Sequence, residues 1–320
     1  MADQGFAAAV ADDLRRVETA LQRAAVAESP FVTQAARHVI DAGGKRFRPL
    51  LVVLGARLLP GAEPWRMDNA ALVVELTHVA SLYHDDVMDQ AQTRRGVEAA
   101  NVHYGNTVSI LVGDYLFARA SSIVCTLGVD FVARQAETFA RLVQGQIGET
   151  RGPAPDDDPM DHYLHVLDGK TASLIATSVV FGGMVAGLPA DQLATLDQFG
   201  HHLGMAFQLH DDLIDITSET SGKTPGADLR AGVATLPVLL LTKTGRPTDQ
   251  ALYEHIRAGL TCAEVDDVLA TLRGHEVMGL ARQQVLDRAE QARSLLAGLP
   301  DCDARDALDQ LCDQVGARSN

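Results

Sequence analysis

Lysine and net positive charge are scarce in this sequence. Lys and Arg number 27 against 42 Asp and Glu over 320 residues, which gives a formal net charge of -15. A chain this acidic repels a phosphate backbone, so we expect no nucleic-acid partner. Only four of the cations are lysines, and three of them, Lys45, Lys170 and Lys223, follow a glycine. Because glycine lets the backbone approach a bound anion, these Gly-Lys steps indicate phosphate contacts.

Cysteine is rare as well. The sequence has four cysteines, and none belongs to a Cys-x-x-Cys pair. The N-terminus does not resemble a secretion signal. These absences favour reduced thiols and a cytoplasmic location.

Long uncharged runs are nearly absent. Residues 171–190 form the one segment that carries no charge over 20 positions, a length that would suffice to cross a membrane. The segment contains hydroxyl side chains, three glycines and Pro189, which favour a buried core helix over a membrane span. No other segment approaches a second span, so we expect no transmembrane helix.

Sustained alternation of apolar and polar residues, the pattern of strands, is hard to find. Helical spacing runs through most of the chain, and stretches rich in Gly and Pro divide it into at least eight helices. None of these stretches looks like an interdomain linker. The sequence therefore predicts an all-α fold, a single helical bundle over residues 1–320. The connection at 218–237 is long for a bundle and is a candidate functional loop.

A His-Asp-Asp-x-x-Asp pattern occurs twice, at 84–89 and at 210–215. On a helix, the first and last aspartates of each copy face the same way and repel each other unless a cation neutralises them. A single copy is often only a solvated acidic face, but both copies here follow apolar helical runs. Carboxylates without Cys or paired His ligands suit Mg²⁺, which substrate phosphate oxygens often complete. The predicted metal ligands are Asp85, Asp86, Asp89, Asp211, Asp212 and Asp215.

A phosphorylated ligand requires basic partners, and the sequence contains them in short clusters. These are Gly43-Gly-Lys-Arg-Phe-Arg-Pro49, Arg94-Arg95, Gly169-Lys170-Thr171 and Gly222-Lys223. Glycine exposes backbone N–H groups to an anion, and arginine binds oxygen atoms bidentately.

Taken in order, these motifs resemble the trans-isoprenyl (polyprenyl) diphosphate synthase family, and among its members the long-chain bacterial enzymes most. The resemblance covers about Gly43 to Pro237. It also includes His78 seven residues before Asp85, Gly113-Asp114, and Phe207-Gln208 ahead of the second acidic motif. It implies a bundle of the isoprenoid synthase type and a homodimer in the cytoplasm. A possible peripheral membrane contact would serve product release.

The resemblance implies a Mg²⁺-dependent prenyltransferase that condenses isopentenyl diphosphate with an allylic diphosphate by ionisation, condensation and elimination. The product would serve quinone side chains. The residues implied in catalysis are Asp85, Asp86, Asp89, Lys170, Thr171, Gln208 and Asp211. Arg94, Lys170 and Lys223 would hold the allylic diphosphate. Gly44, Lys45, Arg48, His78 and Arg95 would hold isopentenyl diphosphate. The Thr171 hydroxyl, the Gln208 amide oxygen and the Lys170 carbonyl would stabilise the allylic cation.

Product length is predicted from helix geometry. Ala80 and Ser81 lie about one turn before Asp85 and should line the first part of the tunnel for the prenyl tail. Both are small, whereas family members with short products tend to carry an aromatic residue at this depth. We therefore expect a product longer than geranylgeranyl diphosphate.

Several alternatives stay open at this stage. Val233 stands where the family often has a second loop lysine, so a catalytically silent subunit of a heteromeric synthase is one of them. A shorter-chain synthase and a class I terpene cyclase are two others, although a cyclase has no use for Lys45, Arg48 and His78. Glu75-x-x-His78 also matches a step used in di-iron bundles. We expect His84, which precedes the first acidic motif, to pack or orient its neighbours rather than bind metal.

Overall fold

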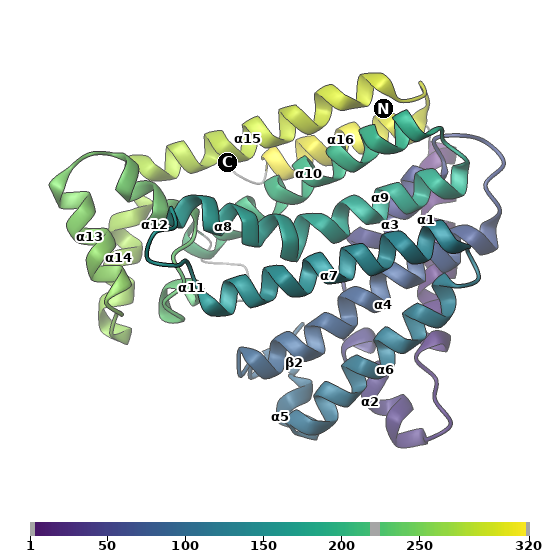
Figure 1. The fold of residues 1–320 in the computed structure, drawn as a ribbon, viewed down its shortest axis with the longest axis horizontal. Coiled ribbons are helices and arrows are strands. Elements are labelled where there is room, and N and C mark those ends of the chain that lie inside the picture. Colours follow the sequence, from purple (N-terminus) through teal and green to yellow (C-terminus); the bar gives the residue numbers. More distant parts are fainter. Residues whose placement is uncertain (1–3, 218–224, 318–320) are drawn as a thin grey trace. The chain divides into compact units, whose positions relative to one another are not determined.

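The all-α prediction is confirmed by the computed structural model, which describes residues 4–217 and 225–317 (Figure 1). In chain order the elements are α1 (Gln4–Ala24), α2 (Pro30–Asp41), α3 (Phe47–Ala56), α4 (Pro64–Met88), β1 (Thr93–Arg94), β2 (Val97–Glu98), α5 (Ala100–Tyr104), α6 (Asn106–Val124), α7 (Val129–Arg151), α8 (Pro159–Leu167), η1 (Asp168–Ala172), α9 (Ser173–Ala186), α10 (Ala190–Thr217), α11 (Ala227–Arg230), α12 (Leu236–Leu240), η2 (Leu241–Lys243), α13 (Pro247–Arg257), α14 (Cys262–Arg273), α15 (Glu276–Leu295), η3 (Leu296–Gly298) and α16 (Asp303–Ala317).

Several of the Gly- and Pro-rich interruptions in the sequence are helix starts. The Ser29 side chain accepts a hydrogen bond from the Val32 N–H, and Pro30 occupies the first turn of α2. Asp158 caps α8 in the same way, and Pro159 follows it. A capped first turn with proline satisfies or removes amide donors that have no partner inside the helix.

Contacts between Cα atoms divide the chain into two compact units. The first comprises Met1–Ala140, Leu174–Gly200 and Leu296–Leu308, and the second comprises Arg141–Ser173, His201–Leu295 and Asp309–Asn320. The prediction of one domain over residues 1–320 stays a prediction.

The core of the first unit is centred on α4, which packs along α6 (Figure 1). Leu76 and Tyr83 of α4 and Leu116 of α6 are completely buried in one apolar cluster. The Tyr83 hydroxyl donates a 2.5 Å hydrogen bond to the Ala35 carbonyl and so ties α4 to α2. The end of α4 that carries the first acidic motif is thereby fixed by neighbouring helices of the same unit.

The second unit contains the other acidic motif, at the end of α10. The Arg273 guanidinium of α14 donates a 2.8 Å hydrogen bond to the Ile216 carbonyl at that end. Helix α12 packs on α15, and α11 packs on α14. The C-terminal part of α10 is therefore fixed by neighbours from the same unit.

Two helical stretches are long and apolar enough by composition to cross a membrane, residues Asn106–Val124 and Pro159–Ala186. The second includes most of the uncharged run, and 72% of its most apolar window is buried, which agrees with a core helix. The expectation that no other segment approaches a span was wrong for the first, which is 33% buried. This stretch is apolar enough to count as a candidate span because Asp114 and Arg119 are its only charged residues.

Glycines bring α3 and α9 into backbone contact inside the first unit. A Cβ atom at Gly55 would lie 2.5 Å from the Val179 carbonyl oxygen and 3.0 Å from the Gly182 Cα atom. Both neighbours are backbone atoms that cannot move aside, so only a residue without a side chain fits.

We expect Gly55→Ala to lower the free energy of unfolding by about 1–3 kcal/mol, because the added methyl group overpacks a backbone contact. Gly279→Ala is the matched control. Gly279 lies exposed in α15, and a Cβ atom there would have no neighbouring atom within 4 Å, so alanine should raise stability by up to about 1 kcal/mol. Urea denaturation of both variants checks the pair, and equal effects would contradict the packing argument.

Candidate active site

The first acidic motif ends α4. Asp86 is completely buried, and the Arg94 guanidinium donates to its Oδ1 atom, with the Nε contact at 2.7 Å. The Oδ2 atom of Asp86 is buried and has no hydrogen-bond partner among the described residues. Asp85 lies one turn before Asp89, which caps the helix. Because the C-terminus of a helix carries partial negative charge, these carboxylates favour a cation there.

A two-residue hairpin turn orients the Arg94-Arg95 pair. Strands β1 and β2 are antiparallel, with Arg94 opposite Val97. Arg95 and Gly96 form the turn and both have positive φ, 53° and 81°, as a tight hairpin with the twist of its strands requires. The two arginines then point to different partners. Arg94 contacts Asp86, and Arg95 donates to the carbonyl oxygens of Val39, at 3.1 Å, and Gly43.

The Gly43-to-Arg46 loop is shaped by its two glycines. Gly43 has φ of 90° and Arg46 has φ of 49°. A Cβ atom at Gly44 would lie 2.9 Å from both the Arg46 Nη1 and the Arg95 Cζ atoms. Gly44 also has φ of 155°, which residues with a side chain rarely adopt, so glycine suits this position where two guanidinium groups approach the backbone. Lys45 beside it is exposed.

The Arg46 side chain connects the loop to neighbouring helices. Its guanidinium donates to both carboxylate oxygens of Glu18, at 2.6 and 2.9 Å, and to Glu75 at 3.0 Å. It also donates to the Ile40 carbonyl at 3.0 Å. With its donors satisfied by protein groups, Arg46 holds the site together rather than offering its charge to a ligand.

Arg48 and His78 lie within this cationic cluster. Burial lowers the pKa of Arg48 to about 10, and the Arg95 charge adds to that effect against the opposing charge of Glu75. The Arg48 Nε atom is buried without a hydrogen-bond partner among the described residues. Burial, and then the charges of Arg48, Arg95, Arg94 and Arg46, hold the pKa of His78 well below its usual range. A neutral imidazole among four guanidinium groups can donate to an anion but does not attract a metal ion.

The di-iron alternative is therefore not supported. Glu75 is bound by Arg46, and His78 is surrounded by positive charge. No group of three or more His, Cys, Asp or Glu side chains within residues 4–217 and 225–317 is arranged to hold a metal ion. A cation at either acidic motif would need further ligands, as Mg²⁺ obtains from water and phosphate oxygens.

In the second unit, hydrogen bonds connect the polar residues of α10 into a chain. The Thr171 hydroxyl donates to the Gln208 amide oxygen at 3.1 Å, and the Gln208 amide donates to Asp212 Oδ1 at 3.4 Å. The Tyr163 hydroxyl donates to the other oxygen of Asp212. Burial raises the pKa of Asp212 to about 7, and the charge of Asp228 adds to the rise, while the hydrogen bonds from Tyr163 and Gln208 oppose it.

The other two aspartates of this motif differ in their surroundings. Asp211 is exposed. Asp215 accepts hydrogen bonds from the N–H groups of Ala227 and Asp228, at 3.1 and 3.2 Å, and so caps the short helix α11. Its role as a metal ligand stays a prediction, but the structure gives it a second task, the capping of α11.

Lys170 and Thr171 lie in η1, one turn of π-helix between α8 and α9. Asp168 at its start accepts hydrogen bonds from His201, at 2.8 Å, and Arg141, at 2.6 Å. The His201 hydrogen bond is the main reason why the pKa of Asp168 is lowered. A Cβ atom at Gly145 of α7 would lie 2.5 Å from the Lys170 nitrogen. A π-turn with this much support is typical of a functional site.

Two further predicted residues belong to this part of the chain. The Lys170 ammonium is paired with Glu149 of α7. Lys223 lies outside the described residues.

The predicted chain-length residues lie on α4 beside α6. Ala80 is completely buried in the apolar cluster of the first unit. Ser81 is half-buried, and its hydroxyl donates to the His78 carbonyl at 2.8 Å. His84 contacts the Ile110 carbonyl of α6 at 3.0 Å, which agrees with the packing role expected for it.

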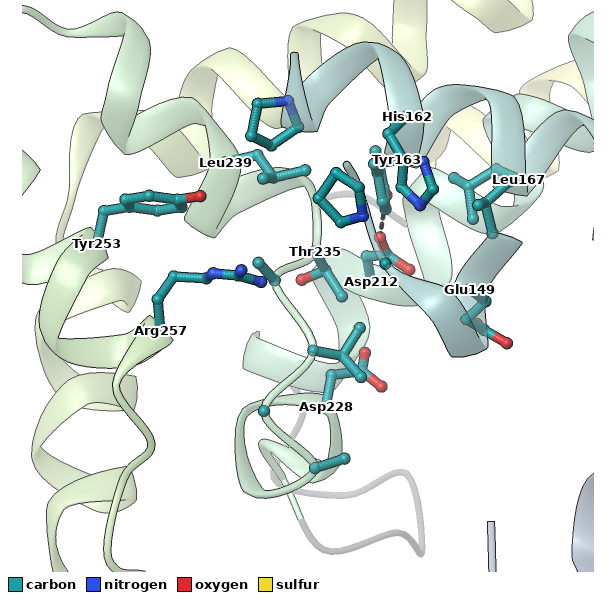
Figure 2. Close-up of a pocket in the computed structure, with 18 of the residues that line it drawn as sticks. Glu149, His162, Tyr163, Leu167, Asp212, Asp228, Thr235, Leu239, Tyr253 and Arg257 are labelled. Atoms are coloured by element: carbon teal, nitrogen blue, oxygen red, sulfur yellow. Dashed lines mark hydrogen bonds between the residues drawn. The ribbon is translucent and has the colours of Figure 1, made fainter. Parts of the chain in front are cut away.

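A pocket of about 340 Å³ opens in the second unit beside Asp212 (Figure 2). Asp212, Asp228 and Glu149 line it together with Tyr163 and Gln208. Figure 2 shows Tyr253 and Arg257 of α13 on the opposite wall. Loop residues 231–235, Val233 among them, line the space between the two walls.

Comparison with known proteins decides the family. The sequence profile described as "Polyprenyl synthetase" matches residues 29–272. This chain belongs to the polyprenyl synthetase family. The predicted family, fold and enzyme class, prenyltransferase, are thereby confirmed. The match extends beyond the motif region at both ends, so helical segments without any motif also belong to the family pattern.

Three relatives illustrate the range of proteins that resemble this polyprenyl synthetase. Nonaprenyl diphosphate synthase of Mycobacterium tuberculosis is 42% identical, and the match covers 99% of this chain and 96% of the relative. The crystal structure of geranylgeranyl pyrophosphate synthase from Corynebacterium glutamicum, complexed with calcium and isoprenyl diphosphate, is 40% identical with a TM-score of 0.89 and covers 99% and 98% of the two chains. That of a decaprenyl diphosphate synthase from Rhodobacter capsulatus is 33% identical with a TM-score of 0.90 and covers 98% of each.

Several polar residues of the polyprenyl synthetase site were missed by the sequence analysis. Tyr163, Asp168, His201 and Asp228 carry no motif of their own. The one available signal was Asp168-Gly-Lys-Thr171, in which an acid precedes the lysine of a predicted phosphate contact. Periodicity could not reveal the π-turn, because one inserted residue changes the helical phase without breaking the apolar pattern.

The raised pKa of Asp212 predicts a pH-dependent stability. In the unfolded chain its carboxyl group loses the proton near pH 4, whereas in the folded protein it does so near pH 7. The folded state therefore loses stability as pH rises through this interval, by up to about 4 kcal/mol at 1.36 kcal/mol per pKa unit.

We expect Asp212→Asn, which cannot ionise, to stabilise the protein at pH 8 and to stabilise it less at pH 5, where the wild type has lost only about a third of this contribution. Chemical denaturation at both pH values in the presence of a chelator measures the difference, since a bound cation would favour the charged form. An equal effect at pH 5 and pH 8 would show that Asp212 does not titrate in this interval.

Proposed function

We propose that this polyprenyl synthetase condenses isopentenyl diphosphate with an allylic diphosphate in a Mg²⁺-dependent reaction, and that its product is longer than geranylgeranyl diphosphate. The observation that carries the proposal is the cationic cluster of the first unit. There Arg48 keeps a buried donor without a partner among the described residues, beside a neutral His78. An anion with several oxygens, such as a diphosphate, would satisfy both groups.

Isopentenyl diphosphate is assigned to this cluster. Arg48 supplies a buried donor, and the half-buried His78 supplies another. Arg95 and Gly44 lie at the loop, and Lys45 is exposed beside them. Bidentate contacts from arginine hold a diphosphate more firmly than surface lysines do. This binding would also relieve the mutual repulsion of the guanidinium groups.

The acidic motifs suit Mg²⁺ by the chemistry of their donors. Asp86 has a buried oxygen atom without a partner among the described residues, and carboxylates are the ligands that Mg²⁺ prefers. Asp85, Asp89, Asp211, Asp212 and Asp215 would complete the set with water and phosphate oxygens. When bound, the metal supplies positive charge that stabilises the departing diphosphate. Arg94 and Lys170, with Lys223, would contact the same diphosphate.

The protein's own part in the ionisation step lies in oriented dipoles. Thr171 and Gln208 are fixed by hydrogen bonds to each other and to Asp212. Their oxygen atoms, with the Lys170 carbonyl, would face the allylic cation without capturing it, because amide and hydroxyl oxygens at fixed distance are weaker nucleophiles than a carboxylate. The released diphosphate would accept the final proton.

Product length rests on α4 and on the relatives. Ala80 is buried against α6, and neither Ala80 nor Ser81 has the bulk to stop a growing tail. Relatives similar to this chain are named as nonaprenyl and decaprenyl synthases, while another is named as a geranylgeranyl synthase. We favour a long product because of the small residues on α4.

A homodimer in the cytoplasm is also proposed. Helix α6 exposes a face of small and apolar side chains, in which Ile110 and Leu111 are 42% and 60% exposed. Along α7 the exposed positions Val129, Ala133, Ala136, Ala140, Val143 and Ile147 recur at steps of four and three. That spacing is typical of a seam between helices of two chains. A peripheral membrane contact for product release is a second use that such apolar faces would allow.

The proposal is tested by product analysis. We expect purified protein with Mg²⁺, labelled isopentenyl diphosphate and farnesyl diphosphate to give a ladder that ends at one long prenol after dephosphorylation. Asp85→Ala should abolish turnover and leave the helical circular dichroism unchanged. A cyclic hydrocarbon without label would favour a terpene cyclase. No product from the wild type would favour a silent subunit, and a ladder that ends at geranylgeraniol would favour the shorter-chain enzyme.

Ser81→Phe is expected to shorten the product by at least one isoprene unit, because an aromatic ring about one turn below the diphosphate would block the tail. Ser294→Phe in α15 is the matched control. Ser294 makes the same bond to a carbonyl three residues earlier, at 2.7 Å, but is exposed. Chromatography of the dephosphorylated products compares the two. An unchanged product length in Ser81→Phe would mean that the tail runs elsewhere.

A further inference from the structure

We propose that Arg257 is a diphosphate-binding residue of the second unit and that the pocket beside Asp212 forms the subsite in which it acts. The inference deepens the proposed function and rests on it, because it assumes that a diphosphate is held near the second acidic motif. It assigns a contact from α13, a helix without any recognised motif.

The pocket contains more acid than base. Glu149, Asp212 and Asp228 line it, and Arg257 is the only lysine or arginine among the described residues that do so. Three carboxylates repel an anion unless cations stand between them. A diphosphate bound here would therefore need both a metal ion on the acidic wall and a fixed positive charge on the other wall.

The position of Arg257 provides that charge. Tyr253 and Arg257 are four residues apart on α13 and so share one face of the helix. Ile256 between them is buried, which anchors this end of the helix beside the pocket. Figure 2 shows both side chains directed at the loop that carries Thr235, across from Asp212. Arg257 is exposed to solvent and can therefore turn to a ligand at small cost.

The loop between α11 and α12 offers no positive charge to a diphosphate in this pocket, so that contact falls to Arg257. Val233 lines the same pocket and is 40% exposed, but its side chain has no donor. Its backbone N–H is already bonded to the Asp228 carbonyl at 2.9 Å. No group at position 233 can contact phosphate, so along this side of the pocket Arg257 and the Tyr253 hydroxyl are the side-chain donors that α13 contributes.

Calorimetric titration with inorganic diphosphate in the presence of Mg²⁺ tests the subsite without turnover. We expect Arg257→Ala to weaken diphosphate binding by roughly tenfold, the effect of one charge-assisted hydrogen bond. In steady-state kinetics the KM for the allylic diphosphate should rise by a similar factor, and the KM for isopentenyl diphosphate should not change. Arg282→Ala, which removes a partly exposed arginine of α15 that does not line the pocket, is the control.

A double variant separates a direct contact from an indirect effect. We expect Val233→Lys in the Arg257→Ala background to restore most of the lost diphosphate affinity, because it returns a cation to the same pocket. Unchanged diphosphate affinity in Arg257→Ala, or a loss equal to that in Arg282→Ala, would overturn the assignment. Absence of any prenyl product from the wild type would instead overturn the proposed function. Calorimetry tests Arg257 and product analysis tests the function, so the two results are told apart.

Discussion

Buried carboxylates hold the cationic cluster of the first unit together. Glu75 is 2% exposed and binds Arg46, while Asp86 is completely buried and binds Arg94. Removal of one partner from such a buried pair costs about 3–5 kcal/mol, because the other charge is left without compensation. With two arginines neutralised in this way, Arg48 and Arg95 can stand near His78 with donors to spare. The site can therefore keep a positive potential in a chain whose net charge is -15.

The Gly-Gly-Lys-Arg-x-Arg-Pro segment also contains one arginine that is paired with carboxylates and one that is not. Arg46 and Arg48 are two residues apart and belong to the same motif, but Arg46 binds Glu18 and Glu75 whereas Arg48 keeps a donor without a partner among the described residues. Arg46 has a left-handed backbone, with φ of 49°, and its side chain is only 10% exposed. The segment thus carries one arginine that is paired with protein carboxylates and, two residues later at the start of α3, one with a donor to spare.

The acidic motifs and the Gly-Lys steps of the candidate site could be predicted from the sequence, because phosphate and metal chemistry requires combinations of residues that are rare elsewhere. Two Asp-Asp-x-x-Asp helix ends repel unless a cation neutralises them, and lysines after glycine let side chain and backbone meet one anion, so both patterns indicate a ligand. The role of the glycine at position 44 was also predicted, and the structure adds a backbone φ of 155° beside two approaching guanidinium groups. The all-α fold followed from helical spacing and from the scarcity of alternating apolar and polar residues.

What could not be predicted depends on residues that are ordinary in sequence and specific only in space. Asp168 becomes important because His201 and Arg141, from distant parts of the chain, both bind it. Asp215 looked like its counterpart Asp89, yet its carboxylate caps α11. The apolar character of α6 was missed because its charges, although few, interrupt every long uncharged run.

The ion pair between Lys170 and Glu149 gives the second unit an internal counter-ion. In the proposed function, a diphosphate that binds Lys170 would compete with this carboxylate for the ammonium group, so association would be an exchange of partners rather than the filling of a vacant charge. Since Glu149 is partly exposed, with 36% of its side chain accessible, it can return to water at little cost. Such an exchange releases few ions to the solvent. It would tie the motion of one acidic side chain to the arrival of the allylic diphosphate and the departure of the diphosphate released from it.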